Sequence, residues 1–205
     1  FFLKTHTESH AFPMCVLLIH QSLFLFTFTD QLRPHLHETL KSLSHNHKLK
    51  LLMITGDHEQ SARLVAKKAA ISDVYFDLRP EDKLRIISNL SENSCLAMVG
   101  DGINDAPALA RATVGISMGQ IGSDTAIDAS DIVLLKDDLS LIEWTYKKAK
   151  DTMHIVRENL TLALCVILLA TTPALLGLIP LWLAVILHEG GTVIVGLNSL
   201  RLLKK

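Results

Sequence analysis

The sequence predicts an α/β domain built on a parallel sheet, followed by a two-helix transmembrane hairpin. Over the first 150 residues, short apolar runs alternate with segments of helical character. This alternation is typical of a parallel sheet covered by helices. Residues 159–187 then contain no Asp, Glu, Lys or Arg. Because a membrane-spanning helix needs roughly 20 residues, two helices fit this run and its apolar continuation better than one.

The composition excludes several classes of protein. Of the 205 residues, 49% are hydrophobic and 20% are charged, whereas disordered chains combine low hydrophobicity with high net charge. The formal net charge is −1, which gives no support to a nucleic-acid partner held by a basic surface. The three cysteines form no CxxC pair, which argues against a disulfide scaffold or a Cys-rich zinc module.

Each element of the α/β domain follows from a local pattern. Apolar runs predict strands, and the more polar segments between them predict helices. The expected strands cover residues 14–19, 23–29, 49–55, 74–76, 95–99, 114–117 and 132–135, and the expected helices cover 34–43, 60–70, 80–90 and 105–110. Pro34 and Pro80 stand where proline fits the first turn of a helix. Residues 138–157 predict a further helix that runs straight into the membrane.

Two membrane helices are expected at about residues 160–178 and 180–200. Gly177 and Pro180 mark the turn between them. Basic residues flank the pair on both sides: Lys147, Lys148, Lys150 and Arg157 precede it, and Arg201, Lys204 and Lys205 follow it. Positive charge at both ends predicts that both ends lie in the cytoplasm. The alternative is a helical hairpin buried in the core of a soluble protein.

Polar residues follow one strand of the expected sheet, where ligands of such sheets bind. Thr55, Gly56 and Asp57 offer a hydroxyl and free backbone N–H groups, which suit an anionic oxygen. An ordinary turn is the alternative there. Lys83 starts a later helix, from which its ammonium could reach the same edge and neutralise a phosphate. A solvated surface lysine is the alternative for Lys83.

A second strand end reads Gly100-Asp101-Gly102-Ile103-Asn104-Asp105. Its glycines allow a sharp bend beside a ligand. Asp101 and Asp105 are four residues apart with the Asn104 amide between them, and such hard oxygen ligands suit Mg²⁺ near a phosphate. The alternative is a solvated acidic loop that caps a helix at Asp105. Carboxylates so close together repel each other without a cation, which favours the magnesium site.

Together these segments resemble the haloacid-dehalogenase-like phosphoryl-transfer proteins, and more closely the phosphorylation domain of P-type cation ATPases. Further strings strengthen the resemblance: Phe28-Thr29-Asp30-Gln31-Leu32-Arg33-Pro34, Arg79-Pro80-Glu81-Asp82-Lys83 and Ala106-Pro107-Ala108-Leu109. The resemblance implies that ATP is a partner and that Thr55, in its Thr-Gly-Asp string, hydrogen-bonds the transferred phosphoryl group. It also implies that Lys83 stabilises a phosphorylated aspartate. Asp101 is then the Mg²⁺ ligand, supported by Asn104 and Asp105.

The sequence departs from this family at the nucleophile. The family's nucleophile is the Asp of an Asp-Lys-Thr-Gly-Thr motif, which does not occur in the chain. Asp30 follows a strand but lacks the rest of such a motif. The resemblance therefore implies that residues 1–22 are the tail of a nucleotide-binding domain, that 23–150 are the second half of a phosphorylation domain, and that 151–205 are the membrane helices. It implies that this chain alone is inactive.

The second membrane helix carries His188-Glu189-Gly190-Gly191-Thr192 inside an apolar span. Ionisable groups at membrane depth are costly and indicate a functional site. His188 and Thr192 share a helix face, and imidazole with carboxylate suits Zn²⁺, Co²⁺ or a similar metal better than Na⁺ or K⁺. A hydrogen bond between helices is the alternative. The string resembles heavy-metal P-type ATPases associated with cobalt, zinc and cadmium.

The sequence as a whole predicts the carboxyl-terminal part of an ATP-driven pump that moves Zn-, Co- or Cd-like divalent ions across a membrane. Its soluble domain is expected in the cytoplasm. Two alternatives are a non-catalytic, membrane-anchored remnant and a soluble phosphatase of the same superfamily, which the hairpin argues against. We expect Cys165 to be a packing residue. We expect the four histidines around the first helix to be solvated: His35, His37, His45 and His47.

Overall fold

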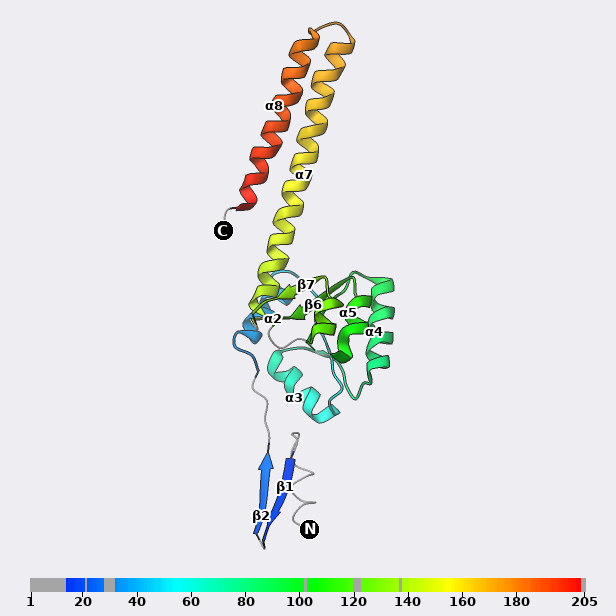
Figure 1. Ribbon diagram of the computed structural model, residues 1–205, viewed down its shortest axis with the longest axis vertical. Coiled ribbons are helices and arrows are strands. Elements are labelled where there is room, and N and C mark those ends of the chain that lie inside the picture. Colours follow the sequence, from blue (N-terminus) through cyan, green and yellow to red (C-terminus); the bar gives the residue numbers. More distant parts are fainter. Residues whose placement is uncertain are drawn as a thin grey trace. The chain divides into compact units, whose positions relative to one another are not determined.

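The computed structural model describes residues 14–20, 22–27, 32–101, 103–119, 123–136 and 138–203. The chain divides into two compact units, residues 1–143 and 144–205. Figure 1 shows the strands and short helices of the first unit and the two long helices, α7 and α8, whose greater part forms the second.

The first two strands form a hairpin of their own. β1 (Met14–Ile19) pairs antiparallel with β2 (Ser22–Thr27). The expectation that all strands join a parallel sheet is therefore wrong for this pair. Only two residues separate the strands, and a parallel pairing needs a crossover of a dozen or more. His20 lies in that turn with a φ of 55°, in the left-handed region that tight turns use.

The remaining strands are parallel, as predicted. β3 (Leu52–Ile54) pairs with β4 (Asp73–Tyr75). β5 (Ala97–Gly100), β6 (Val114–Met118) and β7 (Ile132–Leu134) form a three-stranded sheet in that order. The helices of this unit are α2 (Leu36–His45), α3 (Glu59–Ala69), α4 (Pro80–Asn93), α5 (Ala106–Arg111) and α6 (Asp124–Asp128), with a 3-10 turn, η1, at Ile103–Asp105.

Helices cover both faces of the three-stranded sheet. On one face, Ile87 of α4 and Leu109 of α5 pack against Met98 of β5, and Ile54 of β3 joins the same core. On the other face, Ile116 and Met118 of β6 with Leu134 of β7 pack against residues that begin α7, Leu141 and Ile142 among them. The central strand β6 is thus buried on both faces, whereas Ala97 and Val99 of β5 are exposed. Burial on both faces explains why β6 reads as a short continuous apolar run.

The second unit is a helical hairpin. α7 runs unbroken over Ser140–Leu175, and α8 covers Leu181–Ser199. Within the described residues, these are the two helices long and apolar enough to cross a membrane. α7 ends where the sequence predicts: Gly177 has a φ of 72°, the left-handed conformation typical just after a helix. Pro180 then precedes the first turn of α8.

Candidate functional site

Thr55 and Asp57 form a closed turn at the end of β3. The Thr55 hydroxyl donates to Asp57 Oδ2 (3.0 Å), and the Asp57 backbone N–H donates back to Thr55 Oγ1 (3.1 Å). Asp57 is exposed and Thr55 is half-buried. A Cβ on Gly56 would lie 3.1 Å from the Leu78 carbonyl oxygen, so a side chain there would press against the neighbouring loop. The turn therefore presents a hydroxyl and a carboxylate to solvent at the predicted edge.

Lys83 lies near the start of α4. Its Nζ donates to Asp105 Oδ1 at 2.8 Å, and each side chain is only 16% exposed. A lysine paired this way is not the solvated surface residue of the alternative interpretation. Gly100 makes room for the pair, because a Cβ there would lie 3.1 Å from the Cβ of Asp105. The structure thus places a shielded ammonium–carboxylate pair beside the end of β5.

Asp101 directly follows β5 and faces a second cation. Arg33 Nη2 lies 3.6 Å from Asp101 Oδ2, with side chains 29% and 52% exposed. The sequence predicts no role for Arg33 in this site, although Arg33 belongs to one of the strings that resemble the family. The Arg33-Pro34 string helps to identify the family, but no local sequence pattern indicates which distant carboxylate Arg33 contacts.

The two carboxylates assigned to Mg²⁺ each have a cation of the protein beside them. Lys83 and Arg33 therefore offset the repulsion that was held to require a metal. The described residues contain no group of three or more His, Cys, Asp or Glu side chains that could hold a metal ion. Asp101 is nevertheless half exposed, and carboxylate oxygen is the ligand type that Mg²⁺ prefers. Asn104 is exposed in η1, so the donor set fits magnesium and its binding here stays a prediction.

In α8, the side chains of the predicted transport site are exposed. His188, Glu189 and Thr192 all lie on the open surface of the hairpin. The Thr192 hydroxyl donates to the His188 carbonyl oxygen at 3.2 Å, within its own helix. This contact accounts for the spacing of the two residues without the hydrogen bond to another helix that the alternative supposed. The hairpin alone gives His188 and Glu189 no ligand partners in its described part.

The two glycines of the same string have different surroundings. A Cβ on Gly191 would lie 2.6 and 2.8 Å from the two methyl carbons of Val166 on α7. A Cβ on Gly190 would meet nothing within 4 Å. Glycine at position 191 therefore allows α7 to approach α8 closely, whereas Gly190 faces open space in this chain.

Two other expectations need correction. His47 is not solvated: its side chain is 12% exposed, and its Nε2 lies 3.6 Å from Glu143 Oε1. Ser42 donates to the same oxygen at 2.6 Å, so the start of α7 is fastened to the segment around α2. Cys165 is exposed and therefore does not pack within this hairpin.

The comparisons with known proteins identify the family of the chain. The family model for haloacid dehalogenase-like hydrolases matches residues 2–113. The chain belongs to this family. It is moreover homologous to the heavy-metal-transporting P-type ATPases, which confirms the resemblance seen in its motifs.

Relatives of this kind come from distant organisms. A probable cadmium/zinc-transporting ATPase of the Arabidopsis thaliana chloroplast is 45% identical over 93% of this chain and 23% of its own length. A zinc-transporting ATPase of Bacillus subtilis is 42% identical over 85% of this chain and 27% of its own. The crystal structure of a zinc-transporting PIB-type ATPase in the E2.Pi state superposes with a TM-score of 0.89 at 33% identity, covering 99% of this chain and 33% of that one. The chain thus spans about a quarter of the length of the curated relatives.

Proposed function

We propose that this chain is the carboxyl-terminal part of an ATP-driven pump that moves Zn-, Co- or Cd-like divalent cations across a membrane. One observation carries the proposal. The same chain combines the shielded Lys83–Asp105 pair at a strand end with His188 and Glu189 in an apolar helix. Similarity to cadmium- and zinc-transporting ATPases over most of the chain supports it.

In this proposal the first unit supplies the supporting half of a phosphoryl-transfer site. The Thr55 hydroxyl and the backbone at Gly56 and Asp57 bind phosphoryl oxygens, and Lys83 neutralises the charge that an aspartyl phosphate carries. Asp101 and Asp105, assisted by Asn104, hold Mg²⁺, which when bound would neutralise the transferring phosphoryl group. ATP and the nucleophilic aspartate come from outside this chain, because no Asp-Lys-Thr-Gly-Thr occurs in it.

The second unit supplies part of the transport site. His188, Glu189 and Thr192 offer an imidazole nitrogen and two oxygens, a mixed set that suits borderline divalent metals. Since all three side chains are exposed on the hairpin, further ligands would come from helices outside this chain. The transported ion is therefore bound between this hairpin and the rest of the pump.

We also propose the domain limits and topology given by the sequence. Residues 1–22 are the tail of a nucleotide-binding domain, 23–150 the second half of the phosphorylation domain and 151–205 the membrane helices. The first limit falls at the β1–β2 hairpin and the second inside α7. Both ends of the hairpin, with the soluble unit, lie on the cytoplasmic side, because basic residues flank it at both ends.

The experiment is to replace His188 by Ala in the complete pump and to measure the phosphoenzyme across a panel of metal ions. We expect phosphorylation from ATP to lose its stimulation by Zn²⁺, Co²⁺ or Cd²⁺, because the variant lacks an imidazole ligand. Phosphorylation from inorganic phosphate should survive, because it needs only the intact catalytic site. If His188→Ala keeps the wild-type metal dependence, His188 is not a ligand and the assignment of the ion loses its main support.

The isolated chain separates the alternatives. We expect it to form no acid-stable phosphoprotein with labelled ATP and to hydrolyse no phosphate ester, because covalent phosphoryl transfer needs a nucleophile that the chain lacks. Phosphatase activity would favour a soluble-type phosphatase. The coding sequence upstream separates the pump from a membrane-anchored remnant, since only the pump needs Asp-Lys-Thr-Gly-Thr there.

A further inference from the structure

An open groove of about 610 Å³ lies between α7 and α8, near the residues at which the uncharged run begins. Polar and apolar side chains line it together. Its lining comprises His154, Arg157, Glu158, Thr161 and Leu162 of α7, with Asn198 of α8 and Arg201, which follows α8. None of these residues belongs to the phosphoryl or transition-metal sites proposed above.

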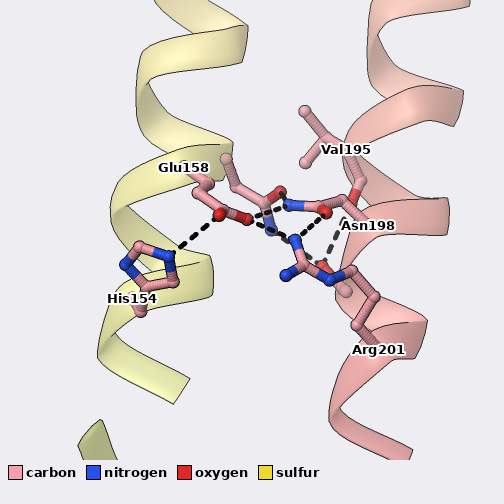
Figure 2. Close-up of polar contacts among 7 residues, drawn as sticks. His154, Glu158, Val195, Asn198 and Arg201 are labelled. Atoms are coloured by element: carbon pink, nitrogen blue, oxygen red, sulfur yellow. Dashed lines mark hydrogen bonds and ion pairs between the residues drawn. The ribbon is translucent and has the colours of Figure 1, made fainter. Parts of the chain in front are cut away.

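A hydrogen-bonded cluster of lining residues joins α7 to α8 and to the turn that follows α8 (Figure 2). Glu158 Oε2 accepts from Arg201 Nη1 at 2.6 Å and from the Asn198 amide at 3.1 Å. Its other oxygen lies 3.0 Å from His154 Nε2. Both oxygens of the one carboxylate in the groove are therefore engaged, and they leave little capacity for another cation.

The groove carries an excess of positive charge. Glu158 balances Arg201, but Arg157 makes no ion pair with any residue in the described part of the chain, and it is exposed. The formal charge of the lining is thus +1 even with His154 neutral. The Thr161 hydroxyl donates to the Arg157 carbonyl oxygen at 2.9 Å. Because the lining carries this net positive charge and the Arg157 guanidinium has no ion-pair partner in the described chain, the groove favours binding of an anion.

The position of the groove selects the kind of anion. Glu158 is the last charged residue before the run of residues 159–187 that carries no Asp, Glu, Lys or Arg. Leu162 lines the groove. Leu160 and Leu164, three and seven residues after Arg157, share the helix face of that arginine and are exposed at 61% and 53%. An occupant that pairs with Arg157 therefore meets apolar surface on the adjoining turns. Basic pockets between membrane helices on the cytoplasmic side bind anionic headgroups in this way.

We propose that this groove binds the phosphate of an anionic membrane lipid, with Arg157 pairing with the phosphate and the acyl chains lying along Leu160 and Leu164 on the same face of α7. The inference rests on the membrane insertion of the hairpin proposed above, but not on metal transport. It gives Arg157 an anionic partner, which the described part of the chain does not supply. A zwitterionic lipid would meet the same apolar surface without the charge complementarity.

The test is native mass spectrometry of the chain in detergent, titrated with phosphatidylglycerol or with phosphatidylcholine of the same acyl chains. We expect tighter binding of the first phosphatidylglycerol molecule, by about fivefold per engaged arginine, which corresponds to roughly 1 kcal/mol for each basic residue. Arg157→Gln should lower that preference about fivefold, whereas Arg157→Lys should keep most of it. Arg85→Gln removes an exposed arginine of the soluble unit and should change nothing.

Three results would overturn the proposal. These are equal affinity of the wild type for the two lipids, an unchanged preference in Arg157→Gln, and displacement of the lipid by excess inorganic phosphate, which would identify a soluble anion as the ligand. Reconstitution into phosphatidylcholine vesicles separates this failure from that of the hairpin. A chain that enters the vesicles but shows no preference refutes the lipid site alone. A chain that stays out refutes the membrane hairpin and the site with it.

Discussion

The clearest prediction concerns Gly191, because the chain contains its own control. Gly191→Ala would place a methyl carbon 2.6 Å from one Val166 methyl and 2.8 Å from the other, whereas Gly190→Ala meets nothing within 4 Å. Apolar carbons prefer separations of about 3.5–4.0 Å, so α8 and α7 must separate or Val166 must leave its rotamer. Val has one strongly preferred rotamer in a helix, so a change of the Val166 rotamer is itself unfavourable.

The magnitude follows from comparing the two alanine variants. Each gains up to about 1 kcal/mol of helix propensity relative to Gly, and this gain cancels in the difference between them. Overpacking of a tight contact costs about 1–3 kcal/mol. We therefore expect Gly191→Ala to be less stable than Gly190→Ala by about 1–3 kcal/mol, with Gly190→Ala equal to or slightly more stable than the wild type.

The assay is denaturant unfolding of the purified chain in mixed micelles, followed by circular dichroism. A second substitution sharpens it. Val166→Ala removes the two methyl carbons nearest to the new one, so it should restore most of the stability lost in Gly191→Ala, as a coupling energy in a double-mutant cycle. Equal stability of the two alanine variants, or no coupling with Val166, would refute the packing argument.

Two further predictions concern the first unit. Lys83→Met leaves the Asp105 carboxylate shielded and unpaired, so it should lower the free energy of unfolding by roughly 1–3 kcal/mol. The control, Arg85→Met, breaks an exposed ion pair and should lower it by less than about 1 kcal/mol. Urea unfolding measures both changes. Hydrogen bonds from Ser140 to the Asp138 carboxylate lower the pKa of Asp138. The Ser140 hydroxyl has the larger effect and the Ser140 backbone N–H the smaller one. Asp138 therefore stabilises the fold above its ordinary pKa of about 3.9, and this contribution is lost as the pH falls through the lowered value. The urea midpoint of the wild type should thus fall more than that of Asp138→Ala between about pH 6 and about pH 3, and equal falls would contradict this account.

Most elements of the fold could be predicted from local sequence. The parallel strands contribute apolar side chains to two cores and so read as apolar runs. Gly177 and Pro180 mark the turn of the hairpin because each has a special backbone conformation. The pairing of β1 with β2 was missed because apolar character does not reveal strand direction. The short link at residues 20–21 does, since a tight turn permits only an antiparallel pair.

The pairing of side chains at the sites was less predictable. Lys83 and Asp105 are 22 residues apart, and Arg33 and Asp101 come from segments still more distant in the sequence. Residue types and strand ends indicated an anionic site, but they could not tell that protein cations would stand beside both carboxylates. His47 was misjudged for the same reason: its partner Glu143 lies on a helix almost a hundred residues later.

Helix α7 links the two units by covalent continuity. The boundary between the units falls after Glu143, inside α7. Before that boundary, Leu141 and Ile142 belong to the core beneath β6 and β7, and Ser42 holds Glu143 at 2.6 Å. After it, Val166 contacts the glycine that adjoins the proposed metal ligands. In the described chain, α7 is the one element shared by both units. In the pump that we propose, coupling of phosphoryl transfer to ion movement therefore passes through this helix or through segments outside this chain.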